Sequence, residues 1–149
     1  MPGKKTIEKA QEDKREGKSA STQAGEFVKD EMDKIRRGEH GARNTKQAIA
    51  IGLSEARRAG VDIKPQGKGE TSEKSRKSQE SAYTKGQHHE PVNATRSKAR
   101  KEALKKEGTS AASHQALSKQ AKSAAAKRTH AERSASAKKA AKTRAAHGK

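Results

Sequence analysis

Hydrophobic residues recur at helical spacing in only one part of the chain, between residues 24 and 63. Ala24, Phe27, Val28, Met32 and Ile35 follow the interval that places side chains on one face of an amphipathic helix. The pattern predicts a helix over residues 24–37. Basic residues occupy its last turn, where cations suit the helix dipole, and the glycine that follows can adopt the left-handed conformation that ends many helices.

A second aliphatic cluster follows a short polar loop. Asn44 and Gln47 have the spacing of an N-cap and capping-box pair, which predicts that a helix begins here and ends before Gly60. At about 100° per residue, most of its aliphatic side chains share one arc. Two such helices joined by a short loop predict a helical hairpin over residues 24–63. We expect its core to contain Phe27, Val28, Met32, Ile35, Ile49 and Leu53.

A hairpin of about 40 residues is at the lower size limit for independent stability. We therefore expect either a marginal fold or one that self-association through residues 24–63 completes. Residues 1–23 are polar, and we expect a disordered segment or a frayed helix that Gly17 ends. Residues 64–91 are rich in Gly, Ser, Lys and Glu without apolar periodicity, which predicts a flexible linker.

The last part of the chain, residues 92–149, is dominated by Ala, Lys and Arg. A short basic helix is expected before Gly108, and residues 110–146 can be drawn as one further helix because alanine is the best helix former. Mutual repulsion of the cations predicts that this tail becomes helical when it meets an anion. The predicted fold class is mostly α, with a short helical hairpin, a basic Ala/Lys-rich helical tail and substantial intrinsic disorder.

Composition supports disorder and excludes several protein classes. Of the 149 residues, 28% are hydrophobic, 1% are aromatic and 36% are charged, so a large core cannot form. No cysteine is present, which excludes a disulfide scaffold and thiol chemistry. No segment approaches the length and apolarity of a membrane span or a signal peptide. We expect a cytoplasmic protein that does not bind a membrane.

The net charge of +18 is unevenly distributed. Residues 1–90 contain 20 basic and 15 acidic residues, whereas residues 91–149 contain 16 basic and only 3 acidic residues. A concentrated basic segment of this kind is typical of polyanion binding, and the shortage of groups suited to base edges favours phosphate contacts without sequence preference. We expect a nucleic acid partner, double-stranded DNA in particular. The predicted contact residues are Arg96, Lys98, Arg100, Lys101, Lys105, Lys106, Lys119, Lys122, Lys127, Arg128, Arg133, Lys138, Lys139, Lys142 and Arg144, with secondary contacts from Lys46, Arg57 and Arg58.

The sequence disfavours several other kinds of binding site. The hairpin could be a helix-turn-helix that reads the major groove, but its turn is longer than usual and no third helix is evident. Tyr83 alone cannot form a base-stacking platform. His88 and His89 lie in a predicted linker without a preorganised third ligand, and the glycines near Gly67 lack phosphate-loop spacing. We expect no enzyme activity, no metal and no cofactor.

The segment GEFVKDEMDKIRRGEHGARNTKQAIAIGLSEARRAGV, residues 25–61, resembles a bacterial domain family of unknown function. Members of that family are small and basic and are sometimes labelled plasmid stabilisation or histone-like proteins. The tail ALSKQAKSAAAKRTHAERSASAKKAAKTRAA is similar in composition to linker-histone tails. The resemblance implies a bacterial setting and marks a domain boundary, and it implies no catalytic or ligand residues.

These observations lead to one leading hypothesis and two alternatives. The leading hypothesis is a histone-like, nucleoid-associated protein that binds DNA by neutralising phosphates and can bridge duplexes. One alternative is a hydrophilic stress-protection protein that is disordered in water. The other is a plasmid or phage accessory factor whose hairpin binds a protein partner. The concentrated charge of the tail favours the first, because a protectant does not need it.

Overall fold

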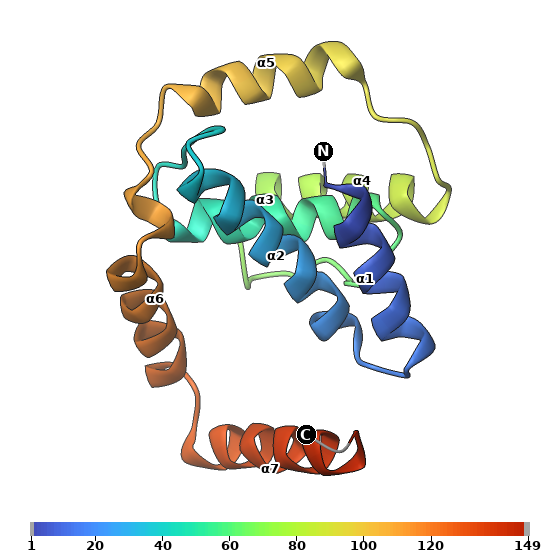
Figure 1. The fold of residues 1–149 in the computed structure, drawn as a ribbon, viewed down its shortest axis with the longest axis vertical. Helices are drawn as coiled ribbons and strands as arrows, with labels where there is room; N and C mark the ends of the chain where they lie inside the picture. The colour runs from blue at the N-terminus through green and yellow to red at the C-terminus, as the bar shows by residue number, and fades with distance from the viewer. Residues whose placement is uncertain (1, 148–149) are drawn as a thin grey trace. The chain divides into compact units, whose positions relative to one another are not determined.

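The computed structural model describes residues 2–147 of the chain. In this part the chain forms α-helices and one short 3-10 helix and contains no strand, which confirms the predicted mostly α class. The chain divides into two compact units, residues 1–113 and residues 114–149. The helices are α1 (Lys4–Arg15), α2 (Ala20–Arg36), α3 (Thr45–Arg58), α4 (Glu73–Gln87), α5 (Ala94–Lys105), η1 (Ser110–Ala112), α6 (His114–Ala126) and α7 (His130–Ala146) (Figure 1).

Helices α2 and α3 form the predicted hairpin, and their ends follow the capping rules. Asn44 Oδ1 accepts a hydrogen bond from the backbone N–H of Gln47 at 2.8 Å. Gln47 Oε1 in turn accepts from the N–H of Arg43 at 2.6 Å, one residue before the N-cap. Gly38 follows α2 with a φ of 75°, as the sequence predicts. Helix α2 begins earlier than predicted, because Ser19 caps it by accepting from the N–H of Thr22.

The two hairpin helices approach each other closely at a glycine. A Cβ atom on Gly52 of α3 would lie 2.7 Å from the Cα of Val28 on α2. The absence of a side chain at this position therefore allows the backbones to pack nearly against each other. Of the six predicted core residues, Phe27, Met32 and Ile35 are buried, whereas Val28, Ile49 and Leu53 are half-buried. Small residues such as Ala24, Ala48 and Ala56 occupy the remaining buried positions.

Residues 2–23 are not disordered: they contain α1, a helix that ends before Gly17 as one of the two alternatives predicts, and this helix is packed. Helix α1 packs against α2, and Ala10 of α1 joins Phe27 and Val61 in the main hydrophobic cluster. The hydrophobic periodicity of this segment is weak, because α1 contributes only two apolar side chains, Ile7 and Ala10, to the hydrophobic cluster. Burial of even this small apolar area, together with the polar contacts of the α1–α2 joint, keeps the helix in place.

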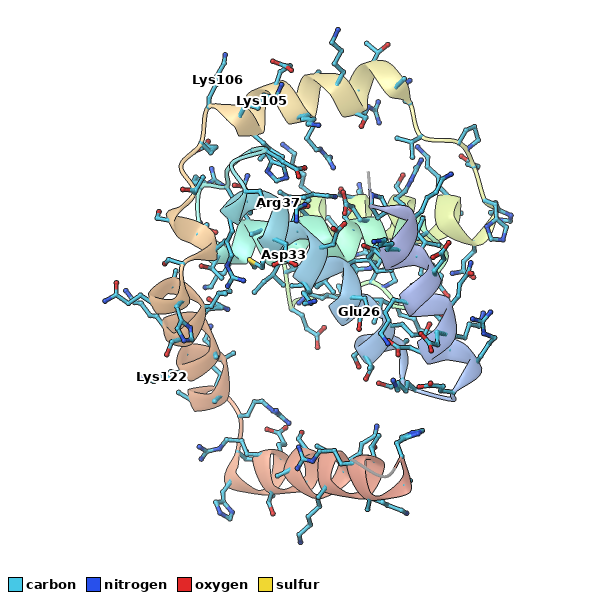
Figure 2. The ribbon with its side chains drawn as sticks, in the orientation of Figure 1. Glu26, Asp33, Arg37, Lys105, Lys106 and Lys122 are labelled. Carbon is cyan, nitrogen blue, oxygen red and sulfur yellow. The ribbon has the colours of Figure 1, made fainter. Side chains whose placement is uncertain are left out.

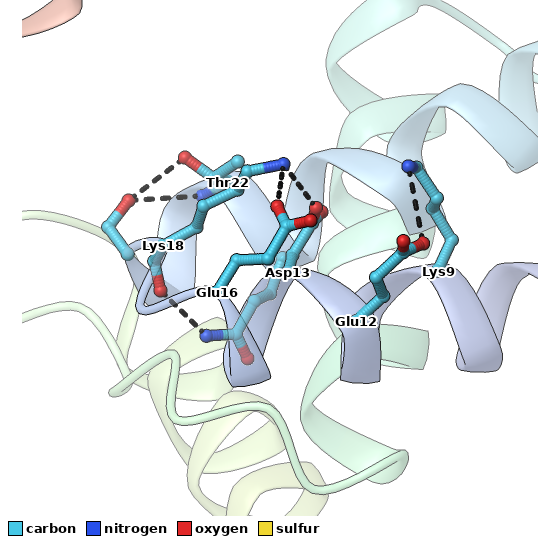
Figure 3. Close-up of polar contacts among 8 residues, drawn as sticks. Lys9, Glu12, Asp13, Glu16, Lys18 and Thr22 are labelled. Atoms are coloured by element: carbon cyan, nitrogen blue, oxygen red, sulfur yellow. Dashed lines mark hydrogen bonds and ion pairs between the residues drawn. The ribbon is translucent and has the colours of Figure 1, made fainter. Parts of the chain in front are cut away.

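The α1–α2 joint is built around a buried carboxylate. Asp13 is 1% exposed, and its Oδ1 lies 2.8 Å from the Nζ of Lys18. The same Nζ lies 2.8 Å from Oε2 of Glu16 (Figure 3). Hydrogen bonding to Asp13 and then to Glu16 raises the pKa of Lys18. Gln23 completes the joint by donating from Nε2 to the carbonyl of Lys18 at 3.0 Å.

Residues 64–91 are not the flexible linker that their composition predicts, because they contain α4, which packs against α3. Helix α4 buries only Ala82 and Gly86, so it lacks the aliphatic stripe that reveals most surface helices. Gly86 lies so close to the carbonyl oxygen of Arg57 that a Cβ atom there would overlap it. Ser72 caps the helix, and Arg76 forms ion pairs with Glu73 and Glu80 along its surface.

Helices α1 and α4 therefore cover the hairpin from within the same chain. The main hydrophobic cluster contains residues from α1, α2, α3 and the segment after α3: Ala10, Ala24, Phe27, Ala56 and Val61. This packing supplies the contacts that a hairpin of about 40 residues lacks. Self-association through residues 24–63 stays a prediction. No helix in residues 2–147 is both long enough and apolar enough to span a lipid bilayer.

Candidate nucleic-acid interface

Helix α5 is the first basic element of the predicted interface, and it belongs to the unit formed by residues 1–113. Asn93 caps it, since its Oδ1 accepts a hydrogen bond from the N–H of Arg96 at 2.9 Å. Only Leu104 is buried along its length, and Ser97 is half-buried. Every predicted contact residue of this element is exposed: Arg96, Lys98, Arg100 and Lys101 on the helix, Lys105 at its last position, and Lys106 just beyond it.

The second basic element comprises α6 and α7, in the unit formed by residues 114–149. Neither helix contains a buried residue. The predicted contact residues of this unit are all exposed: Lys119, Lys122, Lys127, Arg128, Arg133, Lys138, Lys139, Lys142 and Arg144. The abundance of Ala, Lys and Arg favours helix formation here, because these residues have high intrinsic helix propensities.

Residues 110–146 do not form the single helix in which the sequence allows them to be drawn. The helical run stops after Ala126, and Thr129 starts a new helix by accepting from the N–H of Glu132 at 3.2 Å. Glu132 Oε2 accepts from the N–H of Thr129 at 2.8 Å, which completes a reciprocal capping box. The motif Thr-x-x-Glu was present in the sequence, so this break could have been predicted.

The capping box also affects the acidic residue that forms it. Hydrogen bonds from the backbone and side chain of Thr129 lower the pKa of Glu132, and the charge of Arg128 adds to the effect. Arg128 Nη2 donates to the carbonyl of Glu132 at 3.0 Å and also hydrogen-bonds to Ser136 Oγ. Glu132 is the only acidic residue of the second unit, and it serves the helix start. It therefore offsets little of the positive charge along α6 and α7.

Ion pairing is rare among the predicted contact residues. Among the fifteen predicted contacts, Lys105 makes the one salt bridge seen in the described part of the chain, to Glu102 on its own helix at 3.0 Å. In residues 1–91, by contrast, many carboxylates are engaged with basic side chains. These pairs involve Lys9, Lys18, Lys34, Arg36, Arg37 and Arg76. Figure 2 shows the side chain of Lys106 extending away from the end of α5.

The secondary contacts predicted on the hairpin are only partly accessible. Arg57 is 5% exposed, and this burial lowers its pKa. Its Nε donates to the carbonyl of Ile63 at 3.0 Å and its Nη2 to that of Lys64 at 3.4 Å. The prediction that Arg57 contacts phosphate is therefore wrong, because its guanidinium holds the chain that follows α3. Arg58 is half-buried and donates to the carbonyl of Pro91, while Lys46 is exposed.

A buried polar cluster in the hairpin was not identified from the sequence. His40, in the loop between α2 and α3, places Nε2 2.9 Å from Oε1 of Glu31. Lys34 Nζ lies 3.1 Å from Asp30 Oδ2 and 3.8 Å from Glu55 Oε2. No pattern in the sequence marked this cluster, because its members come from both helices and the loop. No group of three or more His, Cys, Asp or Glu residues in positions 2–147 is placed to hold a metal ion.

Comparison with known proteins supports the resemblance of the hairpin segment to a family of unknown function. Residues 15–68 match a family of unknown function (DUF6496). The match includes α2 and α3 and stops before α4, so the basic helices α5, α6 and α7 lie outside it. No curated protein and no solved structure matches the chain.

Proposed function

We propose that this protein binds double-stranded DNA without sequence preference by neutralising its phosphates, as a histone-like component of the bacterial nucleoid. The observation that carries the proposal is the set of exposed cations on α5, α6 and α7, of which only Lys105 is paired with a carboxylate. Unpaired cations are free to replace the condensed counterions of DNA, whose release is the main driving force of such binding.

The distribution of cations around α7 supports bridging of two duplexes. At about 100° per residue, Arg133 and Arg144 lie on one side of the helix, and Lys138, Lys139 and Lys142 lie on the other. A helix with cations on opposite sides can contact phosphates of two duplexes at once. Cations spread around a helix favour contacts with phosphates on several sides over a defined set of base contacts, so these contacts position the helix without reading a sequence.

The two alternatives receive less support. Stress protection by a chain disordered in water is less favoured, because the described residues are largely helical and α1, α2, α3 and α4 pack on one another. A hairpin that docks a protein partner needs an accessible apolar face. The only large hydrophobic residue exposed in the described chain is Val92, which lies outside the hairpin.

The proposal is tested by titrating fluorescent duplex DNA with the full-length protein across a salt series. The variant K138Q/K139Q/K142Q/R144Q removes four cations of α7, and we expect weaker binding with a shallower salt dependence, by up to about 0.9 in the log–log slope for each lost phosphate contact. The matched control, K4Q/K5Q/K74Q/K77Q, removes four exposed cations of α1 and α4 and reaches the same net charge.

The control should retain most of the affinity, because those residues are not part of the predicted interface. Equal losses in the two variants would show that only overall charge matters and would contradict the assigned interface. No binding of the wild-type protein to duplex DNA at low salt would contradict the function itself. Parallel titrations with single-stranded RNA test the preference for a duplex.

A further inference from the structure

Helix α5 is attached to the folded unit at its C-terminal end, and one hydrogen bond tethers the segment that precedes it. Before the helix, Arg58 Nη2 on α3 donates to the carbonyl of Pro91 at 3.3 Å. At its C-terminal end, Leu104 is buried. Between these points the side chains of α5 are exposed, apart from the half-buried Ser97. The helix is thus held in place while most of its surface stays accessible.

The attachment at the C-terminal end consists of backbone hydrogen bonds from the loop between α2 and α3. Gly41 N–H donates to the carbonyl of Leu104 at 2.9 Å, and Ala42 N–H donates to that of Gly108 at 3.0 Å. Two side chains extend the contact to η1. Thr45 Oγ1 donates to the carbonyl of Ala111 at 2.7 Å, and Arg36 Nε donates to that of Ala112 at 2.9 Å.

The loop that makes these bonds is itself fixed to the hairpin. His40 is buried, with Nε2 beside Glu31 Oε1 and Nδ1 2.9 Å from the carbonyl oxygen of Gly41. Gly41 leaves no space for a side chain, since a Cβ atom there would overlap the carbonyl oxygens of Glu107 and Gly108. Its φ is not in the left-handed region, so this position requires glycine because of the close approach and not because of backbone strain.

We propose that residues 40–45 act as a clamp that holds α5 as a rigid basic surface for one duplex of DNA. This inference rests on the proposed DNA-binding function and extends it to the folded unit. Twelve helical residues extend about 18 Å, enough to follow several phosphates. A surface held before binding loses less conformational entropy on association than a flexible chain with the same charge.

In this proposal, the segment that matches the family of unknown function holds α5 in place. That segment contains the loop and both hairpin helices but not α5, so it supplies the support and not the cations. Charge and support are therefore separable by mutation. Removing the support should weaken DNA binding without altering the net charge of the protein.

The test is Gly41→Ala in the full-length protein, with Gly25→Ala as the matched control. Gly25 lies on α2, and a Cβ atom there would meet nothing within 4 Å. We expect Gly41→Ala to accelerate amide hydrogen exchange in the loop and in the segment around Leu104–Ala112. We also expect it to weaken binding to duplex DNA at low salt by about 3- to 10-fold, the range expected from lost preorganisation, while Gly25→Ala changes neither.

A second arm combines Gly41→Ala with R96Q/K98Q/R100Q/K101Q. If the clamp acts through α5, the two losses in affinity will be less than additive, because cations on a released helix contribute less. Should Gly41→Ala prevent folding, Thr45→Val offers a milder variant that removes only the hydrogen bond to Ala111.

The outcomes separate this inference from the proposed function. Faster exchange with unchanged affinity for DNA, or strictly additive losses, would overturn the role of the clamp while leaving DNA binding intact. Unchanged exchange in both Gly41→Ala and Thr45→Val would overturn the clamp itself. Absence of DNA binding by the wild-type protein would overturn the proposed function as well, and the exchange data would still report whether the loop holds α5.

Discussion

The imidazole Nε2 of His40 lies 2.9 Å from Oε1 of Glu31, and both side chains are buried. This contact joins the loop between the hairpin helices to the middle of α2. Burial raises the pKa of Glu31, and the nearby charge of Glu55 raises it further, whereas His40 and Lys34 act in the opposite direction. His40 is therefore the nearest polar partner of this poorly solvated carboxyl group, and Lys34 Nζ lies farther away, 4.0 Å from Oε2.

Removing this partner should destabilise the folded unit. We expect His40→Ala to lower the free energy of unfolding by about 1–3 kcal/mol, because it removes the nearest partner of a buried carboxyl. Urea denaturation followed by circular dichroism measures the change. His88→Ala is the control, since that histidine is exposed. A loss below about 0.5 kcal/mol in His40→Ala, the size of an ordinary surface change, would contradict the role of the contact.

The contact between α3 and α4 should be sensitive to a single methyl group. Gly86→Ala places a Cβ atom against the carbonyl oxygen of Arg57, and we expect a loss of about 1–3 kcal/mol as α4 is displaced. Gly25→Ala has open space and should instead stabilise its helix by about 0.5–1 kcal/mol. Both are measured by urea denaturation. Equal effects of the two substitutions would show that α4 is not closely packed on α3.

Arg57 should matter for stability and not for DNA binding. Arg57→Leu removes the donors that serve the carbonyls of Ile63 and Lys64, and we expect a loss of about 1–3 kcal/mol. DNA affinity, measured on folded protein, should stay within about twofold of the wild type. Lys46→Gln should have the opposite effect, with weaker DNA binding and unchanged stability, because Lys46 is exposed and does not hold the fold. A large loss of affinity in Arg57→Leu at unchanged stability would restore the original prediction.

The start of α7 should respond to acid. The pKa of Glu132 is lowered in the folded state, so its contribution to helix stability is present above the ordinary value of 4.5. The contribution is lost as the pH falls through the lowered pKa, because protonation removes the charge that accepts from Thr129. Hydrogen exchange of the first turn of α7 between pH 3 and 6, corrected for the intrinsic rate, measures this effect. In Glu132→Gln the protection should not vary over that range.

Helices with a periodic aliphatic pattern and segments with concentrated charge could be predicted from the sequence. The spacing of Phe27, Met32 and Ile35 predicted the first hairpin helix, and Asn44 predicted the start of the second. The family match includes the segment where these patterns occur. The packing of α1 and the presence of α4 were not predicted, because small residues and buried polar groups, which give no periodic hydrophobic signal, hold these helices. Composition alone therefore overstated disorder.

The sequence by itself determined the helical class, the capped hairpin and the concentration of positive charge after residue 91, because helix periodicity, capping and charge are local properties. Only the tertiary structure decided that Arg57 is buried and that α5 is held by the loop around Gly41. It also brought His40 against Glu31. These relationships depend on contacts between segments distant in the sequence, and burial and backbone hydrogen bonding of that kind follow from packing and not from residue type.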